Sequence, residues 1–185
     1  MIRTLFLAGL ASGLLSCQAE KPSAIHVDLG PAGQRTFVPR TALAESLLIP
    51  GDHNELRLLL AEGKAACERH IAPQPGQILL HVTVIAPDKV PIGPGTYAWV
   101  PPPQPKNDQP PPVTVRAVPK VHIGTTSHLL RPGGGVQLTK VDLDPNGSVE
   151  GLLAFEFPGD GKSPATRVEG RFTARICNPG GGNGN

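Results

Sequence analysis

Strict alternation of side-chain character near the C-terminus is the feature that most restricts how this chain can fold. Within residues 148–157, apolar or small residues occupy every second position: Val149, Gly151, Leu153, Phe155 and Phe157. Residues 167–177 repeat the pattern with Val168, Gly170, Phe172, Ala174 and Ile176. A period of two is that of a β-strand with one buried face. The two segments therefore predict neighbouring strands, and residues 135–143 predict a third strand of the same meander.

Turn signals separate these strands. Asp144-Pro-Asn-Gly147 ends in Asn-Gly, a strong hairpin signal because both residues tolerate a positive φ. Residues 158–164 form a second turn rich in glycine and proline. The tripeptide Val149-Glu150-Gly151 recurs as Val168-Glu169-Gly170. This indicates two neighbouring strands that require the same residue types on their inward and outward faces.

Further β-type segments precede the meander. Apolar alternation or β-branched residues predict strands in five of them: residues 23–29, 34–38, 77–86, 95–100 and 113–118. Residues 41–48 suit a short helix or an irregular segment. The segment 54–66 fits both a strand and a helix. We favour a strand over residues 55–61, followed by a short helical turn that carries Cys67.

Composition agrees with an all-β domain. Glycine and proline number 22 each among 185 residues, while 39% of the chain is hydrophobic and 4% is aromatic. Valine, leucine and isoleucine must therefore supply most of the core. The proline-rich segment 101–112 reads as a stiff spacer or as a ligand for an aromatic groove, and we favour the spacer. We expect an antiparallel β-sandwich or open barrel with one short helical segment near Cys67.

The N-terminus has the layout of a secretory signal. Met1-Ile2-Arg3-Thr4 is short and positive, and an apolar stretch from Leu5 to Leu15 follows it. That stretch is too short to span a bilayer as a helix, which needs about 20 residues. Cleavage would leave 169 of the 185 residues and lower the formal charge from +2 to +1. One compact domain fits this length, and no basic stripe predicts binding to nucleic acid.

Leu14-Leu15-Ser16-Cys17 closes this segment and resembles the lipobox of bacterial lipoproteins. The alternative is an ordinary cleaved signal that ends near a cysteine. The resemblance implies a signal peptide over residues 1–16, a diacylglyceryl thioether on Cys17 and an acyl chain such as palmitate on its amino group. Residues 17–23 would then form a lipidated tether, 24–177 the β domain and 178–185 a flexible tail. Gln18 after the cysteine favours sorting to the outer membrane.

Lipidation of Cys17 would leave Cys67 and Cys177 as an even pair in an oxidising compartment. We expect a disulfide between them, and two separate thiols are the alternative. From residue 55 to 177 the chain also resembles uncharacterised bacterial lipoproteins. The shared features are a cysteine after a leucine-rich strand, the step Pro94-Gly-Thr-Tyr97 and a closing Gly-x-Phe-x-Ala-x-x-Cys strand. This resemblance implies the fold and the disulfide and brings no catalytic residues.

Other patterns point only weakly to chemistry. Asp142, Asp144 and Asn146 match the opening of a calcium loop, but Leu153 stands where the closing carboxylate belongs, so a hairpin explains them better. The six histidines lack metal-ligand spacing. No serine-hydrolase motif is present. Glu150 and Glu169 could face each other across strands, as a carboxylate pair would require.

These features predict an exported, lipid-anchored protein of the cell envelope. We expect a binding, structural or assembly module with neither catalysis nor a cofactor of its own. Its partners would be the membrane, through Cys17, and an envelope protein or glycan. The alternatives are a periplasmic metal-binding carrier and an envelope hydrolase without a recognisable motif.

Overall fold

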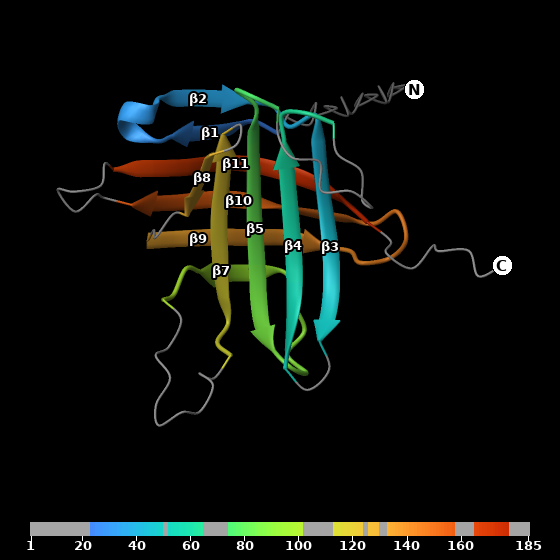
Figure 1. Cartoon of the computed structure of the whole chain (residues 1–185). Coiled ribbons are helices and arrows are strands. Elements are labelled where there is room, and N and C mark those ends of the chain that lie inside the picture. The colour runs from blue at the N-terminus through green and yellow to red at the C-terminus, as the bar shows by residue number, and fades with distance from the viewer. Residues whose placement is uncertain are drawn as a thin grey trace, which may run out of the picture.

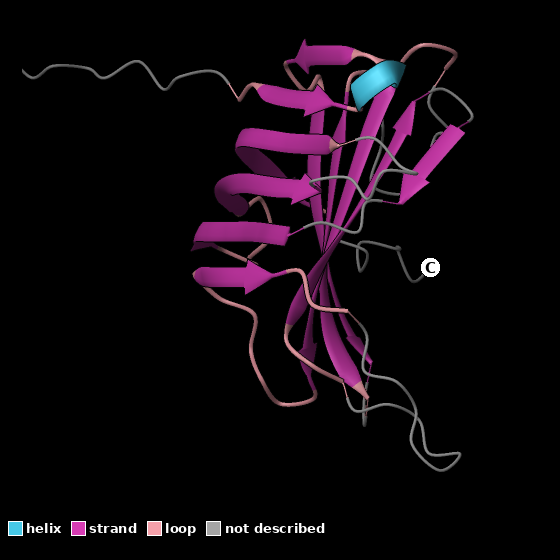
Figure 2. Ribbon diagram, turned by 90° about the vertical axis from the view of Figure 1, so that its left-hand side faces the viewer, coloured by secondary structure: helices cyan, strands magenta, loops and turns pink. Residues whose placement is uncertain are grey.

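The computed structural model describes residues 23–49, 52–64, 74–101, 113–123, 126–129, 133–157 and 165–177. These residues form an all-β fold, as the sequence predicts. A single 3₁₀ turn, η1 at Gly30–Ala32, joins the first two strands (Figure 2). No helix within these ranges is long and apolar enough to span a membrane.

Eleven strands are described, numbered in chain order. They are β1 (Ile25–Asp28), β2 (Gln34–Phe37), β3 (Thr41–Ile49), β4 (His53–Ala61), β5 (Ile78–Pro87), β6 (Gly95–Ala98), β7 (Arg116–Ile123), β8 (Thr126–Leu129), β9 (Gly133–Val141), β10 (Ser148–Phe157) and β11 (Thr166–Ile176).

These strands belong to one hydrogen-bonded sheet in the order β6-β9-β10-β11-β3-β4-β5-β7-β8, with β1 and β2 branching from β11. The first half of β11 pairs antiparallel with β1, and its end pairs with β3. Figure 1 shows the consequence: β3, β4 and β5 cross β9, β10 and β11 at a steep angle. Because β6 also contacts β7, the sheet curls into a nearly closed, barrel-like form.

The space between the crossing strands holds the core. Its fully buried members are mostly valine, leucine and isoleucine, as the scarcity of aromatic residues predicts. Strands β10 and β11 bury the alternating residues that the sequence indicated, including Phe155 and Phe172. Strand β4 alternates in the same way, with Leu56, Leu58 and Leu60 in the core.

A second, smaller apolar cluster lies on the opposite face of β3, β4 and β5. Its buried members are Leu43, Leu59, Ala61, Leu79 and Cys177. Leu59 and Ala61 alternate with core residues along β4, so they point away from the core. The backbone N–H of Cys177 donates to the carbonyl of Ala44 at 2.7 Å, which holds the end of β11 against β3.

The glycines of the repeated Val-Glu-Gly tripeptide allow close backbone approach. A Cβ at Gly151 would overlap the carbonyl oxygen of Gln137, and one at Gly170 would overlap that of Ala24. The repeat therefore marks two points where neighbouring strands pass too close for any other residue.

Several sequence-based predictions are wrong in detail. Residues 41–48 form strand β3 rather than a helix or irregular segment, because β3 pairs with β4 along its whole length. The strand predicted at residues 113–118 instead begins at Arg116, as β7, and continues through Pro119 to Ile123. The pairing of β11 with β3 is parallel, at Arg175↔Leu43 and Ile176↔Ala44, whereas we expected an antiparallel sheet.

The hairpin between β9 and β10 forms where Asn-Gly predicted it, but for a partly different reason. Asn146 has a φ of 70°, while Gly147 is not among the residues with a positive φ. Glycine is required at 147 because a Cβ there would overlap the carbonyl oxygen of Asp142.

Other predictions fall outside the described residues. They concern the signal peptide at 1–16, most of the tether at 17–23, the helical segment near Cys67, most of the proline-rich segment 101–112 and the tail at 178–185. Ser23 is described, and its hydroxyl accepts the backbone N–H of Thr173 at 3.2 Å. The start of the domain is thereby joined to β11.

Candidate functional site

A groove of about 540 Å³ lies between β2 and the turn that enters β5. One wall is formed by β2 and the residues that follow it, and the other by Glu62 and residues 75–77. Phe37 is buried beside it, whereas the neighbouring Val38 is 54% exposed. The groove thus offers both apolar and charged side chains to solvent.

Arg35 reaches across the groove from β2. Its Nη2 lies 2.7 Å from Oε1 of Glu62, and its Nη1 donates to the carbonyl of Gly76. The second oxygen of Glu62 accepts the backbone N–H of Ile78 at 3.1 Å. Because Glu62 follows β4 and Ile78 begins β5, the ion pair is built on the rigid junction of two central strands.

Arg40 carries the second positive charge of the groove. Its backbone N–H donates to the carbonyl of Ala61 at 2.9 Å, so the residue is placed where β3 begins. Its guanidinium forms no ion pair with any of the described residues. With Arg35 neutralised by Glu62, Arg40 leaves the groove with a net positive charge suited to an anionic group.

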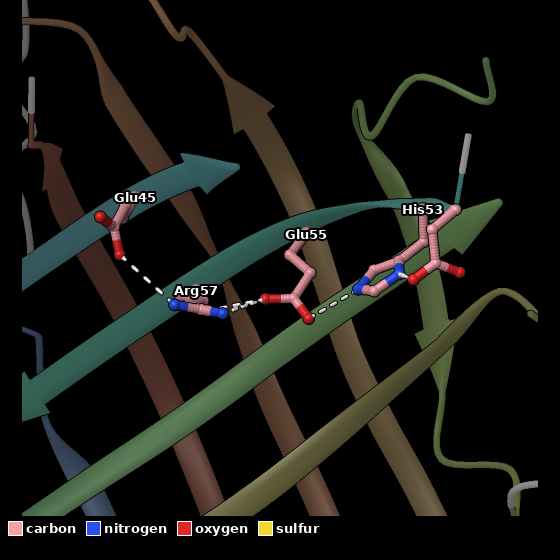
Figure 3. Close-up of polar contacts among 5 residues, drawn as sticks. Glu45, His53, Glu55 and Arg57 are labelled. Carbon is pink, nitrogen blue, oxygen red and sulfur yellow. Dashed lines mark hydrogen bonds and ion pairs between the residues drawn. The ribbon is translucent and has the colours of Figure 1, made fainter. Parts of the chain in front are cut away.

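A separate chain of charged residues lies on the outer face of β3 and β4 (Figure 3). His53 Nε2 is 2.8 Å from Oε1 of Glu55, and Arg57 Nη2 is 2.6 Å from Oε2 of the same carboxylate. Arg57 also reaches Glu45 on β3 at 4.0 Å. His53, Glu55 and Arg57 share one face because they occupy every second position of β4.

Asp52 lies on the other side of the His53 ring. His53 Nδ1 is 2.9 Å from Oδ2 of Asp52, an ion-pair distance without the geometry of a hydrogen bond. The hydrogen bond to Glu55 raises the pKa of His53 above its ordinary value of 6.5. Burial opposes this effect, and Asp52 adds to it.

The pKa of the Glu55 carboxylate shifts in the opposite direction. Burial raises its pKa, but the hydrogen bonds from His53 and Arg57 together outweigh burial, so the pKa lies below 4.5. Between these two folded-state pKa values the pair carries opposite charges, which makes it a structural ion pair on a sheet face.

The predicted calcium-loop residues lie in the β9–β10 hairpin. Asp142 Oδ1 accepts the backbone N–H of Asp144 at 3.2 Å, and the carbonyl of Asp144 accepts the N–H of Gly147 at 2.7 Å. Asn146 supplies the left-handed turn residue. Within the described ranges, no group of three or more histidine, cysteine, aspartate or glutamate side chains is arranged to hold a metal ion.

Register separates the two glutamates that could have formed a carboxylate pair. Glu150 lies opposite Thr173 and Glu169 lies opposite Ala154. Glu150 instead faces Lys140 at 3.6 Å, and Glu169 faces Arg167 at 2.6 Å.

Two histidines predicted to be scattered come together. The rings of His81 on β5 and His122 on β7 meet edge to face, with centroids 5.6 Å apart. Cys177 is disulfide-bonded. The two other cysteines, Cys17 and Cys67, lie outside the described residues, so the pairing with Cys67 stays a prediction.

Sequence reasoning missed the groove. Arg35 and Glu62 are 27 positions apart, and no spacing links them to Arg40. The order of strands brings them together, which single-sequence patterns do not report. One signal was present: Glu55 and Arg57 alternate along the predicted strand 55–61, so the sequence already placed these two side chains on one face, and β4 extends this face back to His53.

Comparison with known proteins gives no match to a protein-family model, a curated protein or a solved structure.

Proposed function

We propose that this protein is a lipoprotein held to the bacterial envelope through Cys17, with a non-catalytic binding module as its exported domain. The anchor rests on the basic, then apolar N-terminal segment that ends at Leu14-Leu15-Ser16-Cys17. The outer membrane is the proposed location, and an envelope protein or glycan is the proposed partner.

One observation carries the binding role: the groove presents the exposed Val38 together with Arg40, whose guanidinium has no ion-pair partner among the described residues. The shifted acid–base pair, His53 and Glu55, lies elsewhere. Glu62 borders the groove just beyond the end of β4, whereas His53 begins that strand, and nine extended residues span about 30 Å. A catalytic site would need such groups to converge in the concave region. The separation favours recognition over catalysis.

For the architecture, we propose an open barrel rather than two stacked sheets. Its support is β11, which hydrogen-bonds to β10 and to both β1 and β3. The crossing layers are therefore continuous through one strand.

The binding role is tested by photo-crosslinking in living cells. A photoreactive amino acid replaces Val38 in the groove, or Thr139, an exposed position on β9 used as the control. We expect a discrete crosslinked envelope component at position 38 that is absent at 139 and is lost on Arg40→Glu. Equal crosslinking at both positions contradicts a binding role for the groove.

The anchor is tested by fractionation. Wild-type protein is expected in the membrane fraction, whereas Cys17→Ala, which cannot take the lipid, is expected in the soluble periplasmic fraction or as uncleaved precursor. An unmodified chain in the aqueous fraction, unaffected by Cys17→Ala, contradicts the anchor.

A further inference from the structure

We infer that the groove binds an extended, acidic peptide segment that adds as a strand to the free edge of β2. This inference rests on the proposed binding function and names its partner class. Addition of a strand to an exposed sheet edge is a common mode of peptide recognition, in which main-chain hydrogen bonds supply affinity and side-chain contacts supply specificity.

One edge of β2 is open to an added strand. Strand β2 pairs with β1 and with no other strand in the described ranges. The N–H of Leu29 donates to the carbonyl of Gly33 at 3.0 Å, which sets the hydrogen-bonding phase of the hairpin. Since backbone groups alternate in direction along a strand, the backbone N–H and C=O groups of Arg35 and Phe37 then point toward β1. The backbone groups of Gln34 and Thr36 face outward and can receive another strand.

The groove runs along this same edge. Four consecutive residues, 35–38, line it. The opposite wall is fixed, because the N–H of Gln77 donates to the carbonyl of Gln74 at 2.9 Å and Oε1 of Gln77 accepts the N–H of Gln74 at 3.1 Å. An extended segment laid along β2 would therefore be enclosed on its far side as well.

The charge and the apolar side chains of the groove determine which segment fits it. Arg35 is already paired with Glu62, whereas Arg40 has no ion-pair partner in the part of the chain that the structure describes, so its guanidinium remains for a carboxylate of the incoming segment. Exposed Val38 offers an apolar contact within two residues of it. A segment with alternating apolar and acidic side chains meets both requirements, whereas a basic segment would face unpaired positive charge.

The test measures fluorescence polarisation of the full-length protein in detergent with synthetic peptides. The probe is a labelled octapeptide of alternating valine and glutamate. One comparison peptide carries lysine in place of glutamate, and another carries N-methyl groups on the backbone amides of one edge. We expect saturable binding of the acidic peptide and at least about tenfold weaker binding of both comparison peptides, a difference worth about 1.4 kcal/mol.

Variants locate the site. Arg40→Glu is expected to weaken binding of the acidic peptide at least about tenfold, while Arg171→Glu, a matched change at an exposed position on β11, is expected to leave it within about twofold. Circular dichroism confirms that each variant is folded. Hydrogen exchange on the unaltered protein gives a second readout, because strand addition should slow exchange of the Gln34 and Thr36 amides.

Three results would each overturn the inference: equal binding of the lysine peptide, equal binding of the N-methylated peptide, or unchanged affinity of Arg40→Glu. Displacement of the peptide by inorganic phosphate at equal concentration would also do so, because it would indicate a simple anion site. If these tests fail while crosslinking from position 38 persists in cells, the groove binds a partner of another class and the proposed function stands.

Discussion

His53 and Glu55, two residues apart on β4, form a 2.8 Å contact between Nε2 and Oε1 on the outer face of the sheet. Glu55 is the centre of this cluster, because its other oxygen accepts from Nε of Arg57 at 2.7 Å. The side chains of His53 and Glu55 are 17% and 12% exposed, so solvent screens the contact only in part.

Glu55→Gln should lower the free energy of unfolding by about 0.5–1.5 kcal/mol at neutral pH, since it removes the charge that both partners share. Urea denaturation measures the change. Glu45→Gln is the matched control: Glu45 lies 4.0 Å from Arg57, and its loss should cost no more than a few tenths of a kcal/mol. Equal losses in the free energy of unfolding for the two changes would show that the 2.8 Å contact stabilises the fold no more than the 4.0 Å contact does.

The same pair predicts how stability depends on pH. Because the folded-state pKa of His53 is raised, its contribution is fully present below about 6.5 and is lost as pH rises through the folded-state value. Because the pKa of Glu55 is lowered, its contribution is present above about 4.5 and is lost as pH falls through the folded-state value.

Stability should therefore be greatest between these two transitions, and His53→Gln should flatten the decline on the alkaline side. NMR titration of the His53 ring checks the cause directly. A midpoint above 6.5 is expected. A midpoint at or below that value would remove the basis of the prediction.

Gly151→Ala should destabilise the fold by about 1–3 kcal/mol or more, because the new methyl group would overlap the carbonyl of Gln137 and crowd the ring of Phe172. Gly93→Ala provides the comparison, since a Cβ at Gly93 meets nothing within 4 Å. Its effect should stay within about 0.5 kcal/mol. Thermal or urea unfolding of the two variants decides the matter, and a tolerated alanine at 151 would be incompatible with the close approach of β9 and β10.

The disulfide of Cys177 is expected to join it to Cys67. Peptide mapping without reduction should yield a linked peptide containing both residues, and Cys17→Ser should leave that peptide unchanged. Such a bond would close a loop of about 110 residues, so Cys67→Ala with Cys177→Ala should cost about 4–5 kcal/mol on a chain-entropy basis. A linked peptide containing Cys17 would contradict both the pairing and the lipid anchor.

The sequence predicted the strands whose burial is one-sided. Strands β10 and β11 alternate cleanly because one face packs into the core and the other meets solvent. Strand β3 escaped prediction because its alanine, leucine and glutamate residues favour helix, and only its pairing with β4 and β11 overrides that preference. The strand predicted at 113–118 ended before Pro119, whereas β7 continues through it to Ile123. Pro119 pairs with Val82 of β5 and lies just before the residues of β7 that pair with β8.

The candidate site was less accessible to sequence reasoning than the fold. Arg35, Arg40 and Glu62 lie on different elements, and their meeting depends on how β2 and the start of β3 lie against the end of β4. Strand order is a global property, so no local spacing encodes it. The disulfide of Cys177 illustrates the opposite case, because the count of cysteines already suggested it.

The most direct test of the lipid anchor is the intact mass of the mature protein purified from membranes. We predict a chain that begins at Cys17 and carries the added mass of a diacylglyceryl group and an amide-linked acyl chain, with the other two cysteines oxidised. A mature chain of unmodified mass, or one whose N-terminus lies beyond Cys17, would contradict the proposal that this domain works from a lipid anchor.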